Sequence, residues 1–268
     1  MVLAALAPVA AAAPVDRHGA ADRAIELAAR GLRKTYDGGA RVVLDGVDLA
    51  VRRHEVVAFM GANGSGKSTL LRCCVRLVEP DAGEITLFGD PISTLKGRAL
   101  RRARGQVGFV FQRHNLVPLA SVLANVVNGG IGRSMACCFQ ATAPGAARER
   151  AFACLERVGL AHLAGRRADR LSGGESQRVA IARALMPGAR LILADEPVAS
   201  LDPHVGEEIM ALLIDVARLD SATVLFSCHV IDHALRLADR ILGLRGGSIV
   251  LDAPARDVSR RDLQALYG

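Results

Sequence analysis

Aromatic residues are scarce in this 268-residue chain: tryptophan is absent and only 3% of the residues are aromatic. Leucine, valine and alanine must therefore fill the interior. With 51% hydrophobic residues, the chain has enough apolar material for one large domain, or for a domain with a subdomain. The net charge of +7 is compatible with phosphate ligands, nucleic acid or an anionic membrane surface, and it does not choose among them. A solvated, arginine-rich surface is the simplest explanation of this charge.

The sequence also lacks the cysteine spacings of a disulfide-rich or zinc-binding domain. Its six cysteines include two adjacent pairs, and no CxxC spacing occurs. We therefore expect reduced thiols in a cytosolic protein. The residues concerned are Cys73, Cys74, Cys137, Cys138, Cys154 and Cys228.

No lysine or arginine precedes the apolar start MVLAALAPVAAAAPV, and Pro8 and Pro14 interrupt it, which argues against a secretory signal. The run is also too short and too rich in alanine to span a bilayer. We predict a disordered, alanine-rich extension over residues 1–24. No transmembrane helix is expected elsewhere, so a membrane role must run through a partner.

From Ile25 onward, short β-like runs are followed by alternating strands and helices. The first runs, IELAARGL and RVVLDGVDLAV, predict an antiparallel β part. Later runs such as EVVAFM and ARLILADE alternate with helical ones, which predicts an α/β fold with a mostly parallel sheet covered on both faces. The stretch TLKGRALRRARG is basic and expected to be exposed. Residues from about 113 to 172 are helical and alanine-rich, and we expect them to form an inserted helical subdomain.

A complete phosphate loop is present. The segment GANGSGKST matches G-x-x-x-x-G-K-[ST], with the strand before it and the helix after it that the motif requires. Its glycines allow backbone N–H groups to surround a triphosphate, and the helix start adds its positive end. Lys67 supplies a charge for the phosphate oxygens, and the Ser68 hydroxyl is a ligand for Mg²⁺. ATP is therefore expected at Gly61, Ala62, Asn63, Gly64, Ser65, Gly66, Lys67, Ser68 and Thr69.

Two carboxylates follow the aliphatic run LILA. A buried strand that delivers Asp195 at its tip suits a Mg²⁺-supporting role in a phosphate-loop enzyme. Glu196, the next residue, is expected to act as general base toward the attacking water. An exposed acidic turn after a strand is the alternative, and the upstream phosphate loop favours catalysis.

Three further residues are candidates for the same site. Gln112 ends the strand VGFVFQ, where its side chain can coordinate Mg²⁺ or the water. His229 follows the strand ATVLFSC, where it can reach the γ-phosphate and orient the water. Tyr36 lies in the first hairpin and can stack on adenine. The alternatives are a surface glutamine, a capping or buried histidine, and a core or rim tyrosine.

The stretch LSGGESQRVAIARAL predicts a second helix N-terminus that can bind an anion, because Ser172, Gly173 and Gly174 stand directly before a run with helical spacing. The phosphate loop already holds one face of a nucleotide. We therefore expect this second helix end to cap the γ-phosphate of another copy's ATP in a head-to-tail dimer. An ordinary capped helix is the alternative.

Taken in order from Tyr36 to His229, these motifs resemble those of an ABC transporter ATP-binding subunit. LSGGE resembles the family signature and SLD its D-loop, while Gln112 and His229 match its Q-loop and switch histidine. The resemblance extends from about residue 25 to 268. It implies a phosphate-loop (RecA-like) hydrolase core with ATP and Mg²⁺ as cofactors. The resemblance further implies metal-supporting roles for Ser68, Gln112 and Asp195, contact of Ser172–Glu175 with the partner's nucleotide, and Asp202 at the dimer interface.

Three residues differ from the pattern of the family, and none of the three differences removes a catalytic group. Glu175 stands where the signature usually has glutamine, and Cys228 precedes the switch histidine. Oxidation of the Cys228 thiol would slow turnover, whereas a buried thiol there is inert. His54 stands where the family generally has glycine, so the turn is strained if it needs a positive φ.

Within the family, the stretches HNLVPLASVLANVVNGGIGR, LADEPVASLDP and LQALYG are similar to ATPases of phosphonate importers, as is the long stretch from Gly129 to Arg148. The resemblance implies an ATPase that energises import of phosphonates or a related small oxyanion. Its expected partners are a second copy, transmembrane permease subunits and, indirectly, a solute-binding protein, with no nucleic acid. The expected location is peripheral, at the cytoplasmic face of the cell membrane. The alternatives are a soluble ABC ATPase that acts on nucleic acid or ribosomes, and an exporter or cell-division ATPase.

Overall fold

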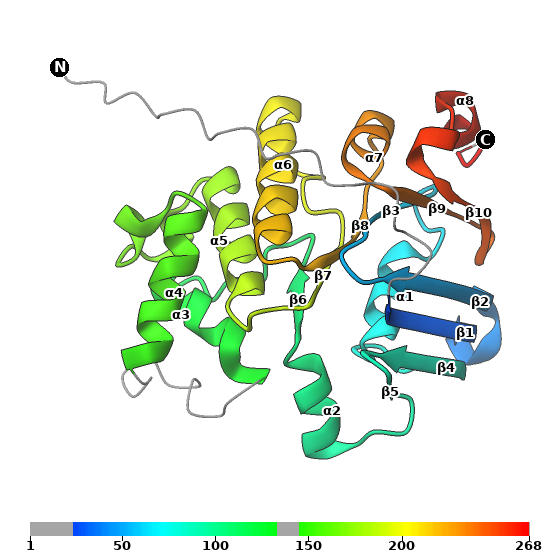
Figure 1. Ribbon diagram of the computed structural model, residues 1–268, viewed down its shortest axis with the longest axis horizontal. Coiled ribbons are helices and arrows are strands. Elements are labelled where there is room, and N and C mark those ends of the chain that lie inside the picture. Colours follow the sequence, from blue (N-terminus) through cyan, green and yellow to red (C-terminus); the bar gives the residue numbers. More distant parts are fainter. Residues whose placement is uncertain (1–23, 133–144, 268) are drawn as a thin grey trace.

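The computed structural model describes residues 24–132 and 145–267. Two sheets and the helices around them make up the fold (Figure 1). The predicted N-terminal extension lies outside the described residues except for Ala24. Cys137, Cys138 and part of the long stretch from Gly129 to Arg148 lie outside them as well.

The first sheet is antiparallel, in the order β2-β1-β4-β5. Its two long strands come from the first β-like runs of the sequence, where apolar residues such as Leu27 and Leu49 are buried and polar ones such as Arg30 and Asp48 are exposed. The strands are β1 (Ile25–Tyr36), β2 (Arg41–Arg52), β4 (Ala82–Leu87) and β5 (Asp90–Pro91).

The second sheet has the order β10-β9-β3-β8-β7-β6, and all its neighbouring strands are parallel except the β9–β10 pair. Its central strands are buried at every residue, as their continuous apolar runs require. The strands are β3 (Val56–Met60), β6 (Val107–Val110), β7 (Leu191–Ala194), β8 (Thr223–Ser227), β9 (Arg240–Arg245) and β10 (Ser248–Pro254).

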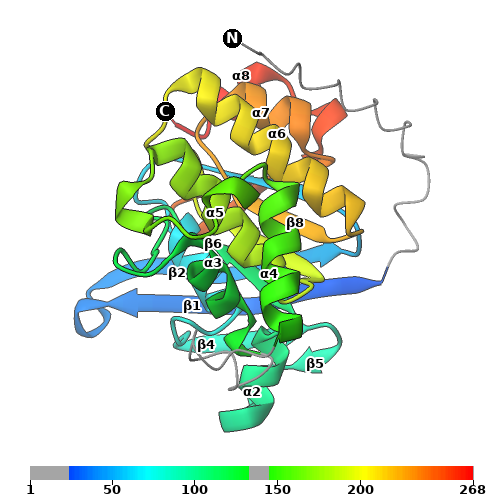
Figure 2. The same ribbon diagram turned by 90° about the vertical axis from the view of Figure 1, so that its left-hand side faces the viewer.

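Helices cover both faces of this second sheet. One apolar cluster joins α1 with the antiparallel sheet and with one side of the strands, and a second cluster joins α3 to α7 with the other side. Figure 2 shows α3, α4, α5 and α6 in front of the strands. The helices are α1 (Lys67–Cys74), α2 (Gly97–Arg104), α3 (Val122–Val127), α4 (Gly145–Arg157), α5 (Gly173–Leu185), α6 (Pro203–Leu219), α7 (Ile231–Leu237) and α8 (Arg260–Gln264).

The basic stretch expected to be exposed forms α2. Arg101 and Arg102 are exposed, but Arg104 turns inward and donates a 2.8 Å hydrogen bond from Nε to the Val75 carbonyl. The sequence does not show the apolar spacing typical of a helix here, because α2 buries a single residue, Ala103.

His54 occupies a turn with a φ of +61°. Residues with a Cβ are strained in this left-handed region of backbone conformation. This explains why the family generally has glycine at the position of His54. The backbone N–H of His54 stabilises the turn by donating a 2.9 Å hydrogen bond to Thr223 Oγ1.

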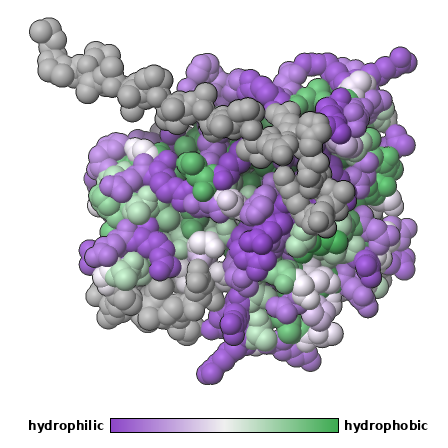
Figure 3. Space-filling view, viewed as in Figure 1, coloured by the Kyte–Doolittle hydropathy of each residue, from purple (hydrophilic) through white to green (hydrophobic). Residues whose placement is uncertain are grey.

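The surface mixes hydrophilic and hydrophobic residues on the face seen in Figure 3. None of the helices in the described part combines the length and the apolar character that a bilayer crossing demands.

The sheet order determines where chemistry can occur. Strands β3, β8, β7 and β6 are adjacent and parallel, so their carboxyl ends meet at one edge. The segments that leave this edge begin with Gly61, Cys228, Asp195 and Phe111. Ligands of open α/β sheets bind outside such an edge.

A substitution at Gly108 tests how closely β6 packs against α5. A Cβ built on Gly108 would lie 2.3 Å from the Ala184 carbonyl oxygen. We therefore expect Gly108→Ala to lower the free energy of unfolding by about 1–3 kcal/mol, as overpacked sites do. Urea denaturation followed by circular dichroism measures this change. Gly165→Ala is the control, since a Cβ there meets nothing within 4 Å, and equal midpoints for the two variants would contradict the prediction.

Candidate nucleotide site

The phosphate loop connects β3 to α1, as the sequence predicts. Gly66 stands at the N-cap of α1 with a φ of +107°, and a Cβ on it would lie 2.8 Å from the Val43 carbonyl oxygen. Only glycine fits this position, because both the backbone conformation and the close approach exclude a side chain.

A cavity of about 310 Å³ opens beside this loop. Within the loop, Ser65 Oγ is buried without a hydrogen-bond partner in the described part of the chain. Tyr36 lies at the cavity with 39% of its surface exposed, where an aromatic ring can contact a base. The lining residues are Tyr36, Arg41, Val43, Gly64, Gly66, Lys67, Ser68, Thr69 and Glu196.

Lys67 is almost fully buried, with 4% of its surface exposed. Its Nζ donates to the carbonyls of Gly61 and Ala62 at 2.8 and 3.1 Å, and it lies 3.7 Å from Glu196 Oε1. Burial lowers the pKa of Lys67, and the charge of Glu196 opposes that shift. The lysine charge therefore faces the cavity from within the loop.

Asp195 is fully buried directly after β7 and points to the α1 side of the sheet. Ser68 Oγ donates to its Oδ1 at 2.7 Å, and Arg72 Nη2 lies 3.2 Å from its Oδ2. Hydroxyl and carboxylate oxygens are the ligands that Mg²⁺ prefers, so Ser68 and Asp195 fit this ion. Gln112, the third predicted ligand, contacts Glu196 rather than this pair, with Nε2 3.3 Å from Oε2.

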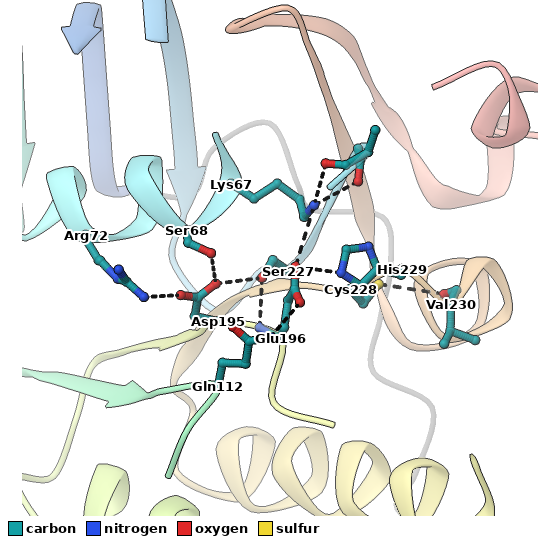
Figure 4. A network of polar contacts seen from close by, with 12 residues as sticks. Lys67, Ser68, Arg72, Gln112, Asp195, Glu196, Ser227, Cys228, His229 and Val230 are labelled. Carbon is teal, nitrogen blue, oxygen red and sulfur yellow. Dashed lines mark hydrogen bonds and ion pairs between the residues drawn. The ribbon is translucent and has the colours of Figure 1, made fainter. Parts of the chain in front are cut away.

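Glu196 is the point where the predicted catalytic side chains converge (Figure 4). His229 Nε2 lies 2.6 Å from its Oε1, and Lys67 and Gln112 approach the same carboxylate. Glu196 itself has a φ of +47°, a conformation that is uncommon for non-glycine residues. The carboxylate is 13% exposed and borders the cavity, so it can reach a water molecule there.

The signature residues form the start of α5. Ser172 Oγ accepts from the Glu175 N–H at 3.2 Å, and Glu175 Oε2 accepts from the Ser172 N–H at 2.7 Å, a capping box. The hydrogen bond from the Ser172 backbone lowers the pKa of Glu175, which keeps this carboxylate ionised. Glutamate therefore serves as well as glutamine for closing this helix end.

The signature packs against the start of α6 and not against the phosphate loop of its own chain. Positions for a Cβ on Gly173 and Gly174 lie 3.2 and 3.1 Å from side-chain carbons of Leu201 and Val205. Asp202 caps α6 by accepting from the His204 N–H at 3.0 Å. Among the described residues that line the cavity, none comes from 171–175 or from Asp202.

Three residues near the site escaped the sequence analysis: Arg72, Ser227 and Tyr267. Arg72 follows Ser68 by four residues on α1, so helical spacing alone could have placed both on one side. Ser227 contacts Asp195 from a neighbouring strand, and Tyr267 lies against the Gly61 backbone from the far end of the chain. No local pattern reports these last two contacts.

Together these groups provide what transfer of a phosphoryl group to water needs. The loop and Lys67 line the cavity, Ser68 and Asp195 suit Mg²⁺, and Glu196 brings a carboxylate to the cavity, the kind of group that can act as a base. The fold and the site define a phosphate-loop nucleotide hydrolase.

Comparisons with known proteins narrow this class. The model of the family described as ABC transporter matches residues 44–199. The chain is 47% identical over 230 residues to the phosphonates import ATP-binding protein PhnC of Nocardia farcinica, covering 85% of this chain and 86% of the relative. It is also 47% identical over 240 residues to the phosphate-import ATP-binding protein PhnC of Mycolicibacterium smegmatis, covering 89% and 90%.

A solved structure agrees with these relatives. The dimeric, post-hydrolysis ATP-binding cassette MJ0796, bound to ADP and Pi, superposes with a TM-score of 0.74 at 34% identity, covering 86% of this chain and 99% of that one. The chain therefore belongs to the ABC transporter family of ATP-binding proteins.

Cys228, beside the switch histidine, is expected to be unreactive in the folded protein. Burial raises the pKa of this thiol to about 12, which leaves about one thiolate in 10⁴ molecules at pH 8. Iodoacetamide should therefore leave the Cys228 peptide unmodified in native protein and modify it after denaturation in guanidinium, as measured by mass spectrometry. Equal modification rates in the native and the denatured protein would show that the Cys228 thiol is accessible, and would support a redox role for it.

Proposed function

We propose that this chain is the ATP-hydrolysing subunit of an importer for phosphonates or a related small oxyanion such as phosphate. One observation carries the enzymatic part: the Glu196 carboxylate borders the cavity and has His229 Nε2 at 2.6 Å and Lys67 Nζ at 3.7 Å. The names of the relatives from Nocardia and Mycolicibacterium support the solute class.

In the proposed reaction, the loop N–H groups and Lys67 hold the phosphates of ATP, and Tyr36 stacks on its base. Ser68 and Asp195 would hold Mg²⁺, which offsets phosphate charge when it is bound, with Gln112 the third predicted ligand. Glu196 accepts a proton from the attacking water. His229, in contact with the Glu196 carboxylate, keeps it aimed at the cavity and orients the water.

A second copy completes each site in this proposal. The signature residues Ser172–Glu175 lie outside the cavity of their own chain, so the capped end of α5 is available to the nucleotide of a twin. Asp202 at the start of α6 then lies at the same interface. The dimeric state of the similar cassette MJ0796 supports this arrangement.

The membrane partners are proposed as permease subunits, served by a solute-binding protein, with this chain peripheral on the cytoplasmic face. The loop between β6 and α3 supports a protein partner, because Val117 is 50% exposed and Leu119 is 72% exposed. This loop contains Gln112 and thus links the nucleotide site to the helical subdomain proposed over residues 113–172.

Glu196→Gln tests the catalytic assignment. Loss of the base should lower kcat for ATP hydrolysis by about 10²- to 10⁴-fold, and the unhydrolysed ATP should hold the dimer closed. Phosphate release measures the rate, and light scattering after gel filtration measures the dimer. Lys67→Ala should neither hydrolyse ATP nor dimerise, whereas Glu84→Gln, at an exposed position on β4, should behave as wild type. A monomeric Glu196→Gln protein in saturating ATP would contradict the dimer proposal.

Uptake measurements test the importer assignment. In cells that lack this gene, uptake of radiolabelled methylphosphonate should be lost, and the wild-type gene should restore it while the Glu196→Gln gene should not. Phosphate uptake is measured in parallel. Loss of phosphate uptake alone would identify phosphate as the oxyanion, and undiminished uptake of both solutes would contradict the importer proposal.

A further inference from the structure

Ser227 is the last residue of β8 and is fully buried. In the parallel register of β7 and β8, Ala194 pairs with Phe226. One step further along both strands, Ser227 lies across from Asp195. The register therefore places a hydroxyl beside the two carboxylates at the end of β7.

This hydroxyl binds both acidic residues at once. Ser227 Oγ donates to Asp195 Oδ1 at 3.3 Å, and it accepts from the Glu196 backbone N–H at 2.9 Å (Figure 4). A serine hydroxyl has one proton to donate and lone pairs to accept with, so both bonds form together. A single oxygen atom thus links the residue that suits Mg²⁺ to the residue that serves as base.

Glu196 needs such a partner because its φ is +47°. A left-handed conformation at a non-glycine residue persists only where the surrounding structure determines it. The end of β8 holds Glu196 at two points: Ser227 at the backbone N–H, and His229 Nε2 at the carboxylate, 2.6 Å away. The backbone and side chain of Glu196 are therefore oriented by the last residue of β8 and by the segment that follows it.

We propose that Ser227 is a positioning residue for ATP hydrolysis. Its hydroxyl fixes the Asp195 carboxylate and the Glu196 main chain relative to each other, so that the Mg²⁺ position and the base keep a constant separation. The inference rests on the ATP-hydrolysing role proposed for the same site. Partners in the shell around a metal site change affinity or activity by about 10- to 100-fold when they are removed.

Thr223 offers a matched control for a purely structural hydroxyl. It lies on the same strand and the same side as Ser227, four residues earlier, and it is also fully buried. Its Oγ1 accepts from the His54 N–H at 2.9 Å, at the opposite end of β8 from the site. Ser227→Ala and Thr223→Val each remove one buried hydroxyl from β8 and little else.

We expect Ser227→Ala to lower kcat by about 10- to 100-fold and to raise the Mg²⁺ concentration needed for half-maximal rate. Binding of ATP in EDTA should not change, since Ser227 does not line the cavity. Thr223→Val should keep the wild-type kcat and Mg²⁺ requirement. Ser227→Thr keeps the hydroxyl and should restore both quantities.

A readout without nucleotide separates this inference from the proposed function. Hydrogen exchange, followed by mass spectrometry on peptides that contain Glu196, should show a faster-exchanging Glu196 amide in Ser227→Ala and an unchanged one in Thr223→Val. This exchange measurement tests the positioning role of Ser227 even if the wild-type chain hydrolyses no ATP. Ser227→Cys, which fills the same space with a weaker hydrogen-bonding group, replaces Ser227→Ala if the alanine protein does not fold.

Two results would overturn the proposal. One is a wild-type kcat and Mg²⁺ requirement in folded Ser227→Ala, or in folded Ser227→Cys. The other is an equal loss in Thr223→Val, because the effect would then follow from any buried hydroxyl on β8.

Discussion

The burial of the Asp195 carboxylate is the constraint on which the rest of the site depends. A carboxylate with no exposed surface must be paired, since an isolated charge in the interior is very costly. Ser68 and Arg72 approach it from α1, and Ser227 approaches it from β8. The phosphate loop, strand β7 before Glu196 and strand β8 before His229 are therefore tied to one side chain.

Glu196 shows how the same constraint produces a reactive group. Its neighbour Asp195 faces α1, while the left-handed backbone at Glu196 turns the next side chain toward Lys67, Gln112 and His229. Two successive carboxylates thus have different surroundings, one enclosed and one bordering the cavity. Different surroundings allow chemically identical groups to take different roles.

The signature helix start belongs to the same scheme although it lies elsewhere in the chain. Its capping box closes the first turn of α5 through Ser172 and Glu175, so this helix end is held by bonds within its own chain. This end lies against α6 and outside the cavity of its own chain, which is the position that the proposed head-to-tail dimer uses. In the proposed dimer, a preformed helix end would lower the cost of association.

The sequence by itself determined the α/β class, the phosphate loop and the acidic pair after LILA, because each depends on spacing within one short segment. It left open whether the turn at His54 needs a positive φ, and the structure shows a φ of +61° there. Only the tertiary structure decided that Ser227 and Tyr267 belong to the site. Contacts of this kind depend on the pairing register of strands and on packing between distant segments, and a linear pattern of residue types does not encode them locally.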